Sequence, residues 1–316
     1  MQITIVGLGI VGQSIGLALK QVAPEIRIVG HDADAAQVKS ARSLGAIDSS
    51  HWNLVSACDG ADIILLDIPF AELAMTLDAI GPDLGAEAVV SDLIPIKSEV
   101  MAIAREHLAQ PARFCGGHLV SPALLNLQGP SADWLSSATY FMVAPPSLSA
   151  QAMDKMANLA DALGCKPQFT SAEEHDGLVA AMQQLPELAG AAILDTLVAS
   201  AGARDRANAV GLALSAHATA LERGAPDPEQ EWLANRTNLS RWLDLYIQRL
   251  TVARDALLDK DIDTLQAMAT SADHAAKDWF DAEPQGNDVE SPSLSPWRSM
   301  FLGGLRFKRD HKPEKR

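Results

Sequence analysis

Long apolar runs are absent from this sequence: it has no stretch of about eighteen apolar residues, so we expect no membrane-spanning helix. Cysteine is scarce as well. Cys58, Cys115 and Cys165 are too far apart to suggest a metal site or a disulfide framework. We therefore expect buried, reduced thiols and no bound metal, as in a cytoplasmic protein. An apolar run that begins at residue 2 leaves no room for a signal or transit peptide, which favours the same location.

Positive charge is the other shortage. The chain has 25 Lys and Arg residues against 40 Asp and Glu residues, which gives a formal net charge of −15 at pH 7. This balance argues against nucleic acid as a partner, because phosphate groups would be repelled. It also means that an anionic substrate needs a nearby lysine or arginine to overcome the overall field.

Much of the positive charge lies at the end of the chain. Seven of the 25 basic residues fall within 298–316, where they are interleaved with apolar side chains such as Trp297 and Phe301. We interpret residues 283–316 as a basic and aromatic tail that is disordered by itself. The alternative is a tail that docks on the acidic body or on a neighbouring subunit.

The first half of the chain alternates short apolar runs with helical stretches, from residue 2 to residue 143. This alternation predicts an α/β fold with a doubly wound parallel sheet and helical crossovers. We assign residues 1–168 to a Rossmann-type domain of this kind.

After residue 168 the pattern becomes helical. Ser171 and Glu174 are spaced as in a capping box, and apolar residues then recur at helical spacing, with no strand signal from 171 to 281. We predict an all-helical substrate and dimerisation domain over 169–282. Its last two helices are long and apolar enough to suggest a homodimer with a shared helical core. The alternative is a self-contained bundle.

A glycine motif, Gly7-Leu-Gly9-Ile-Val-Gly12, follows the first apolar run, and a helical stretch follows at once. In a dinucleotide-binding turn, the first glycine permits the bend, the second lets the backbone approach a pyrophosphate and the third lets the helix pack on its strand. Asp32 follows the second apolar run, at the spacing of a carboxylate that binds ribose hydroxyls. The alternative is a glycine-rich turn without a ligand.

The acid at position 32 also predicts the kind of cofactor. A carboxylate there would repel a 2′-phosphate, so the pattern favours NAD over NADP. The carboxyl end of the third long apolar run is expected at the same edge of the sheet, where ligands bind in open α/β sheets. The predicted cofactor contacts are Gly7, Gly9, Ile10, Val11, Gly12, Asp32, Ile68 and Pro69.

Further motifs follow in a set order along the chain. They are Asp92-Leu-Ile-Pro95-Ile-Lys97, Gly117-His118, His175-Asp176, Gln184-Leu-Pro-Glu187 and Trp232-Leu-Ala-Asn235. In order and spacing they resemble the prephenate/arogenate dehydrogenase family over about residues 1–282. The resemblance implies an NAD-dependent oxidative decarboxylation of prephenate or arogenate in tyrosine biosynthesis.

His118 is the catalytic residue that the resemblance implies. Oxidation of an alcohol needs a base for the hydroxyl proton as hydride leaves the carbon, and an imidazole titrates in a suitable range. In the family, the matching histidine bonds the ring hydroxyl of prephenate. The alternative for His118 is a loop histidine bonded to the backbone. For His175, in the first turn of a helix, we favour a structural role at the domain junction.

Several positions depart from the family pattern. Pro95 stands where the family has a serine, and Gln184 and Glu187 stand where it has histidines. Glu187 would repel an anionic substrate in a desolvated site, whereas the amine of arogenate would tolerate it better. The family's substrate arginine also has no counterpart between residues 212 and 221.

These departures leave a short set of candidate substrate contacts: Lys97, Gln184, Glu187, Arg223 and Arg236. We expect at least one of the three basic residues to point toward His118. These changes weaken the inference that prephenate is the substrate more than the inference that the protein is a dehydrogenase. One alternative function is therefore a related NAD-dependent dehydrogenase for another cyclic or hydroxy acid. Another is a non-catalytic NAD-binding sensor.

Overall fold

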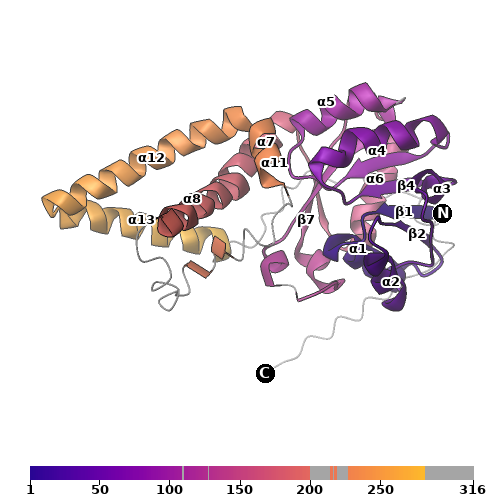
Figure 1. Cartoon of the computed structure of the whole chain (residues 1–316), viewed down its shortest axis with the longest axis horizontal. Helices are drawn as coiled ribbons and strands as arrows, with labels where there is room; N and C mark the ends of the chain where they lie inside the picture. The colour runs from indigo at the N-terminus through magenta and orange to yellow at the C-terminus, as the bar shows by residue number, and fades with distance from the viewer. Residues whose placement is uncertain (109, 127, 200–213, 216, 219–226, 282–316) are drawn as a thin grey trace. The chain divides into compact units, whose positions relative to one another are not determined.

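The computed structural model describes residues 1–108, 110–126, 128–199, 214–215, 217–218 and 227–281 (Figure 1). The chain divides into two compact units, Met1–Ile247 and Gln248–Arg316. The expected domain boundary between residues 168 and 169 lies inside the first unit, which contains the sheet and the helices that follow it. Arg223 and the tail, residues 283–316, lie outside the described residues.

An eight-stranded sheet forms the centre of the first unit, with the strand order β3-β2-β1-β4-β5-β6-β7-β8. The strands are β1 (Gln2–Val6), β2 (Arg27–His31), β3 (Ser49–Ser50), β4 (Ile63–Leu66), β5 (Val89–Asp92), β6 (Phe114–Val120), β7 (Thr139–Val143) and β8 (Lys166–Phe169). The order reverses between β1 and β4, which is where a doubly wound sheet binds its ligand. The predicted Rossmann-type fold is confirmed.

The sheet departs from the expected parallel arrangement at one pair of strands. Strand β6 runs antiparallel to β7, with His118 opposite Phe141, whereas the other neighbouring strands are parallel. The connection between β6 and β7 contains the short helices η4 (Pro122–Asn126) and η5 (Asp133–Ser137). The described part of this connection contains no α-helix of the kind that usually carries a parallel crossover, and the chain returns here as an antiparallel neighbour.

Helices cover both faces of the sheet (Figure 1). On one face α1 (Ile10–Val22) contacts α6 (Ala150–Leu163), and on the other α4 (Leu73–Ile80) contacts α5 (Ser98–His107). The remaining helices of the sheet region are α2 (Ala35–Ser43), α3 (Leu54–Cys58), η1 (Phe70–Glu72), η2 (Gly81–Asp83) and η3 (Pro111–Arg113).

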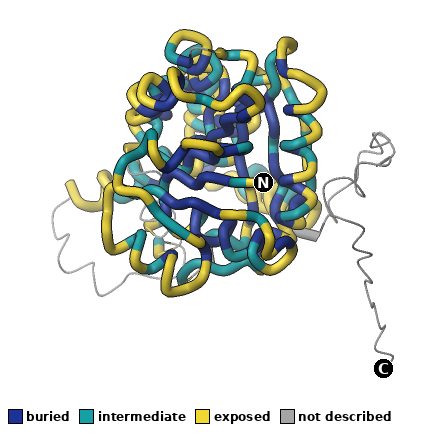
Figure 2. Tube along the Cα trace, turned by 90° about the vertical axis from the view of Figure 1, so that its right-hand side faces the viewer, coloured by how far each residue is buried: buried dark blue, intermediate teal, exposed yellow. Residues whose placement is uncertain are grey.

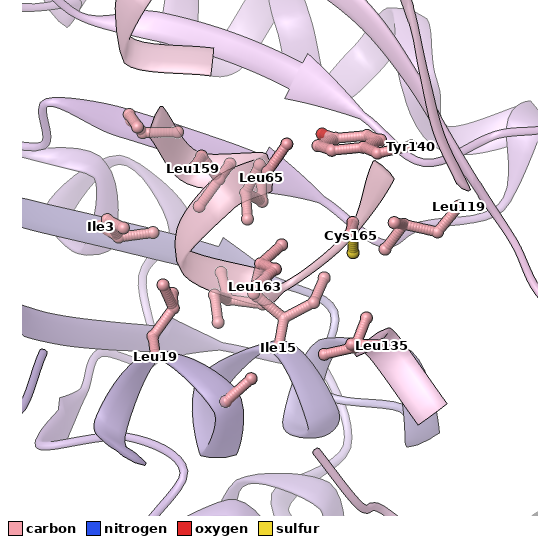
Figure 3. Packing of buried hydrophobic residues seen from close by; sticks show 14 of the residues in the cluster. Ile3, Ile15, Leu19, Leu65, Leu119, Leu135, Tyr140, Leu159, Leu163 and Cys165 are labelled. Carbon is pink, nitrogen blue, oxygen red and sulfur yellow. The ribbon is translucent and has the colours of Figure 1, made fainter. Parts of the chain in front are cut away.

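Strand β4 shows how the sheet separates two hydrophobic cores. Ile63 and Leu65 belong to the core under α1 and α6, whereas Ile64 and Leu66 belong to the core under α4 and α5. All four side chains are fully buried, because successive residues of a central strand point to opposite covered faces. Figure 3 shows Leu65 within the first core, and Figure 2 shows the buried strands enclosed by exposed loops.

The helices that follow the sheet are α7 (Ala172–Val179), the π-helical turn η6 (Ala180–Gln184), α8 (Leu185–Ala199), α11 (Pro228–Ala234), α12 (Arg236–Asp259) and α13 (Ile262–Asp281). The predicted capping box is present, since the Ser171 hydroxyl accepts the Glu174 N–H at 3.1 Å. The described part of 171–281 contains no strand, as expected.

Two expectations from composition can be compared with the structure. The three cysteines are buried and free, as predicted. The helical stretch Ala172–Ala199, however, is long and apolar enough to cross a membrane, judged by length and composition alone. Its first turns are hydrogen-bonded to the start of α5 through Asp176, as in a helix of a folded domain, so we assign it no membrane role.

Gly16 and Gly177 lie in contrasting helical environments. A Cβ added to Gly16 of α1 would lie 2.3 Å from the carbonyl oxygen of Ala46, so the helix packs directly on backbone there. A Cβ added to Gly177 of α7 would have no atom within 4 Å in the described structure.

We expect Gly16→Ala to lower the free energy of unfolding by about 1–3 kcal/mol, because the backbone must shift to accept the methyl group. Gly177→Ala should raise it by about 0.5–1 kcal/mol, because alanine favours the helix. Denaturant unfolding measures both variants, and changes of the same sign would contradict the packing described.

Candidate active site

The loop between β1 and α1 has the geometry of a dinucleotide-binding turn. Gly7 has a φ of +92°, and a Cβ there would lie 1.9 Å from the Asp67 carbonyl oxygen. A Cβ at Gly12 would lie 2.2 Å from the Gly7 carbonyl oxygen. A Cβ added at Gly9 would have only Asp67 Oδ2 within 4 Å in the described structure, at 3.7 Å, so the space before the helix is open. The N–H groups at the start of α1, from Ile10 onward, suit a phosphate there.

Asp32 is held against this loop. Its Oδ2 accepts the Leu8 N–H at 2.7 Å, and its Oδ1 accepts the Asp34 N–H at 2.7 Å. A carboxylate accepts about four hydrogen bonds, so positions are left for ribose hydroxyls. The glycine turn and Asp32 therefore fit an NAD-type dinucleotide.

Asp67 also lies in this loop region, although the sequence reasoning assigned no role to it. It follows β4 together with the predicted cofactor contacts Ile68 and Pro69, and all three are half-buried. Its Oδ2 accepts the Gly12 N–H at 2.8 Å. Burial raises the pKa of Asp67 to about 6, the Gly12 N–H opposes that shift, and the negative charge of Asp32 adds to it.

A buried ion pair lies beyond the end of β5. Lys97 Nζ donates to Asp92 Oδ2 over 2.5 Å, and neither side chain is exposed. Asp92 also accepts the N–H groups of Ile94, at 2.9 Å, and Gly117, at 3.1 Å. Burial raises the pKa of Asp92 and lowers the pKa of Lys97, and the contact between them opposes both shifts. Lys97, a predicted substrate contact, is therefore already paired within the protein.

Asp176 joins the helical region to the sheet region. Its Oδ1 accepts the Lys97 N–H at 2.5 Å, and its Oδ2 accepts the Ser98 N–H at 2.8 Å. These N–H groups open α5, where a negative charge is favoured. Burial raises the pKa of Asp176. His175 and the N–H donors of α5 lower that pKa by more than burial raises it, so the net pKa is below its ordinary value.

His118 and His175 form a buried pair. Nδ1 of His118 lies 3.2 Å from Nε2 of His175, and the ring planes meet at 79° with their centroids 5.2 Å apart. Phe141 also packs against His175, with ring centroids 5.1 Å apart. Burial lowers the pKa of His118 well below 6.5, and the neighbouring His175 and Lys97 lower it further. His175 thus contacts the predicted base directly, in addition to lying at the junction.

The charges around the pair indicate the direction of its hydrogen bond. Nδ1 of His175 lies 4.0 Å from Asp176 Oδ1 and has no hydrogen-bond partner in the described structure. A proton on this nitrogen faces the carboxylate favourably, whereas a lone pair would be repelled. Nε2 of His175 is then the acceptor and Nδ1–H of His118 the donor. This arrangement leaves a lone pair on Nε2 of His118, as the predicted role of a general base requires.

Gln184, a predicted substrate contact, has its amide bonded inside the protein. Its Nε2 donates to the Glu231 carbonyl at 3.2 Å, and its Oε1 accepts from Asn235 Nδ2 at 2.8 Å. Asn235 Nδ2 also donates to the Asp176 carbonyl at 2.9 Å. This buried amide therefore positions α11 against η6 and α7, and its contact with a substrate stays a prediction.

Glu187 and Glu231 bring two carboxyl groups to the same region. Glu187 lies one helical turn beyond Gln184, on the same side of the helix, and Gln184 bonds the backbone of Glu231. Burial raises the pKa of Glu231 to about 7, the charge of Glu187 adds to that shift, and the charge of Lys97 opposes it. Burial also raises the pKa of Glu187. The sequence reasoning missed Glu231, which directly precedes the Trp232 of the recognised motif.

The expected basic residue beside His118 is Lys97. Its charge acts on both His118 and Glu231, although Asp92 holds its ammonium group. Arg236 is exposed and donates from Nη1 to the Leu233 carbonyl at 3.4 Å, and its contact with a substrate stays a prediction. Among the described residues, no group of His, Cys, Asp or Glu has a metal-binding arrangement.

A glycine turn at the switch point of a doubly wound sheet, with a buried histidine pair at the same edge, defines a Rossmann-type dinucleotide-binding protein. Residues 15–166 match the nucleotide-binding domain of prephenate dehydrogenase. The chain is also 25% identical over 276 residues to the cyclohexadienyl dehydrogenase of Zymomonas mobilis, covering 83% of this chain and 90% of that protein. Over residues 15–166 the chain is therefore similar to the nucleotide-binding domain of prephenate dehydrogenases.

Other relatives match over part of their length. The chain is 25% identical over 194 residues to the prephenate dehydrogenase of Bacillus subtilis, covering 61% of this chain. It spans 52% of that relative, about half its length.

Solved structures share the fold. The prephenate dehydrogenase of A. aeolicus, in complex with hydroxyphenyl propionate and NAD+, has a TM-score of 0.75 at 17% identity, covering 88% of this chain and 98% of that chain. The arogenate dehydrogenase of Synechocystis has a TM-score of 0.69 at 19% identity, covering 88% of this chain and all of that chain.

We expect Asp176→Asn to lower the free energy of unfolding by about 1–3 kcal/mol, because the charged acceptor at the start of α5 is lost. The folded-state pKa of Asp176 is lowered, so its contribution is complete above the unfolded pKa of about 4 and disappears as the pH falls through the folded value. Denaturant unfolding at several pH values should show this difference closing in acid.

Asp161→Asn, at an exposed position on α6, is the matched control and should show no such pH dependence. A difference between wild type and Asp176→Asn that grows on acidification would contradict the assigned role of Asp176.

Proposed function

We propose that this protein is an NAD-dependent dehydrogenase that converts prephenate or arogenate, with loss of CO2, in tyrosine biosynthesis. The observation that carries the proposal is the buried His118–His175 pair, which leaves Nε2 of His118 free to accept a proton. The fit of the glycine turn and Asp32 to a dinucleotide supports NAD as the cofactor. Asp32 also supports NAD over NADP, because its charge would repel a 2′-phosphate.

The chemistry requires one base that gives its proton back. Bound NAD+ supplies the hydride acceptor. Nε2 of His118 accepts the proton of the ring hydroxyl while the C–O bond becomes a carbonyl. The ring carboxylate then leaves as CO2, and the electron pair of the broken C–C bond restores an aromatic ring with negative charge on its oxygen. His118 returns the proton to that oxygen, so the base is regenerated.

The surroundings of His118 suit this role. Burial and the neighbouring groups keep its pKa well below 6.5, so the imidazole is neutral and able to accept a proton at neutral pH. When the proton arrives, Nδ1–H of His118 continues to donate to His175, whose own Nδ1 faces the Asp176 carboxylate. Asp176 therefore positions His175 and favours the transient positive charge.

The acidic pair favours arogenate over prephenate. The two substrates differ in the side chain, where arogenate carries an ammonium group and prephenate a keto group. The charge of Lys97 acts on both His118 and Glu231, and Glu187 adds a second negative charge beside Glu231. An ammonium group would be attracted by this pair, whereas the oxygen of a keto group carries partial negative charge and would not be. We infer that the amine-bearing substrate is preferred.

We also propose a cytoplasmic homodimer that forms through the helical region. The three free, buried cysteines support the location. Helix α12 exposes a run of large apolar side chains, which in a soluble helix marks a contact with another chain. They include Trp242, Leu245, Ile247, Leu250, Leu257 and Leu258.

We expect His118→Gln to lower the turnover number ~10²–10⁴-fold, the usual effect of losing a general base. The dissociation constant for NAD+ should stay nearly unchanged, because His118 lies outside the glycine turn. NADH absorbance with prephenate or arogenate measures the first quantity, and calorimetric titration with NAD+ measures the second.

His107→Gln, at a partly exposed histidine on α5, is the matched control and should turn over normally. Normal turnover of His118→Gln would remove His118 from the mechanism. NAD+ binding without NADH formation from either substrate would favour the alternatives of another substrate or a sensor.

We expect Glu231→Gln to lower kcat/KM for arogenate about 10–100-fold, the worth of a charge-assisted contact of about 1.5–3 kcal/mol, without lowering kcat/KM for prephenate. Because the pKa of Glu231 is about 7, kcat/KM of the wild type for arogenate should rise with pH through that value. Steady-state kinetics with both substrates from about pH 6 to about pH 8 measure the effect.

Glu173→Gln, at an exposed position in the first turn of α7, is the control and should leave both substrates unaffected. A wild-type preference for prephenate, or an equal loss for both substrates in Glu231→Gln, would contradict the inference about the amine.

A further inference from the structure

A protein carboxylate occupies part of the site where the cofactor's pyrophosphate is expected. Helix α1 begins at Ile10, and Gln13 is the first of its residues to donate along the helix, to the Gly9 carbonyl. The three preceding N–H groups are therefore available to an acceptor outside the helix. Asp67 Oδ2 takes the N–H of Gly12 at 2.8 Å. Negative charge already lies at the positive end of this helix before any ligand binds.

The same carboxylate borders the space in front of Gly9. The only described atom within 4 Å of a Cβ added to Gly9 is Asp67 Oδ2, at 3.7 Å. A pyrophosphate that approaches the backbone at Gly9 must therefore lie close to Asp67. Two negative groups a few ångströms apart in a partly desolvated loop repel each other, and the weaker acid then takes up a proton.

The charged groups around Asp67 offer little compensation. From β2, Asp32 adds negative charge, and the ring of His31 is bonded to the His51 carbonyl at 3.0 Å. Helix α1 carries no charged side chain before Lys20. On the neighbouring strand, Asp92 is neutralised by Lys97.

We propose that Asp67 couples cofactor affinity to pH: the dinucleotide binds the form of the protein in which the Asp67 carboxylate has taken up one proton. The proton comes from solvent and converts the carboxylate to a carboxylic acid, which can donate to a phosphate oxygen where the carboxylate would repel it. This inference rests on the proposed NAD function, and it assigns a role in binding to a residue outside the glycine motif.

The pKa of Asp67 in the free protein places this coupling in a pH range where binding can be measured. Burial raises the pKa of Asp67 to about 6, with Gly12 opposing and Asp32 adding to the shift. Asp67 is therefore mostly ionised at neutral pH, and each further pH unit should weaken NAD+ binding about tenfold. Below about pH 5 the group is mostly protonated and the dependence should vanish.

Calorimetric titration with NAD+, in buffers of different ionisation enthalpy, tests the proposal. At about pH 7.5 the wild type should take up close to one proton per NAD+ bound, and near pH 5 almost none. Asp67→Asn, whose amide oxygen can still accept the Gly12 N–H, should take up none at either pH. At about pH 7.5 this variant should bind NAD+ at least about tenfold more tightly than the wild type.

A stability measurement shows whether the variant is folded and whether the ionised group is costly. Because the folded-state pKa of Asp67 is raised, its ionisation destabilises the free protein as the pH rises from about 4 to about 6. Asp67→Asn should therefore raise the melting temperature near pH 8 and not near pH 4. Asp62→Asn, just before the other end of β4, is the matched control and should keep the wild-type proton uptake.

The outcomes separate this inference from the proposed function. NAD+ binding to the wild type with no proton uptake and no change of affinity between about pH 5 and about pH 8 overturns the role of Asp67 and leaves the dehydrogenase function intact. If NAD+ binds neither the wild type near pH 5 nor Asp67→Asn near pH 7.5, the proposed function is overturned, and this inference with it.

Discussion

The hydrogen bonds from the start of α5 to the Asp176 carboxylate are the interaction on which the site depends. They attach α7, which carries His175, to the turn that carries Lys97 and follows β5. Because Asp176 is the neighbour of His175 in sequence, the same contact brings the imidazole of His175 against His118 on β6. The tautomer of His118, the proposed base, therefore depends on the junction between the helices and the sheet, and not on β6 alone.

The second organising feature is negative charge close to both expected ligands. Asp32 and Asp67 border the glycine turn, and the charges of Glu187 and Lys97 act on Glu231, in a chain with a net charge of −15. Asp92 already neutralises Lys97 within the cluster. Two of these acids have pKa values raised into the range of about 6 to about 7, so changes in protonation can lower the repulsion when a ligand arrives. This acidity supports the proposed preference for an amine and the proposed response to pH.

The sequence predicts those features that depend on local spacing. The glycine turn, the capping box at Ser171 and the alternation of strands and helices each follow from contacts within a few residues, and the fold class is confirmed. The antiparallel direction of β7 is not predicted, because a short apolar run does not show which way a strand runs in the sheet. The role of Gln184 is not predicted either, since its partners on α11 lie far along the chain. The roles of Asp67 and Glu231 are not predicted for the same reason: burial in the folded chain raises their pKa values.

The central claim is that the buried pair holds His118 neutral, with its proton on Nδ1 and the lone pair of Nε2 available to the substrate. Long-range ¹H–¹⁵N spectra of protein labelled at the histidine ring nitrogens report this directly, and His118→Gln identifies the signal. From about pH 6 to about pH 8, His118 should show one protonated nitrogen at Nδ1 and one unprotonated nitrogen at Nε2, with no titration in that range. A His118 signal that titrates near pH 6.5, or a proton found on Nε2, would contradict the account.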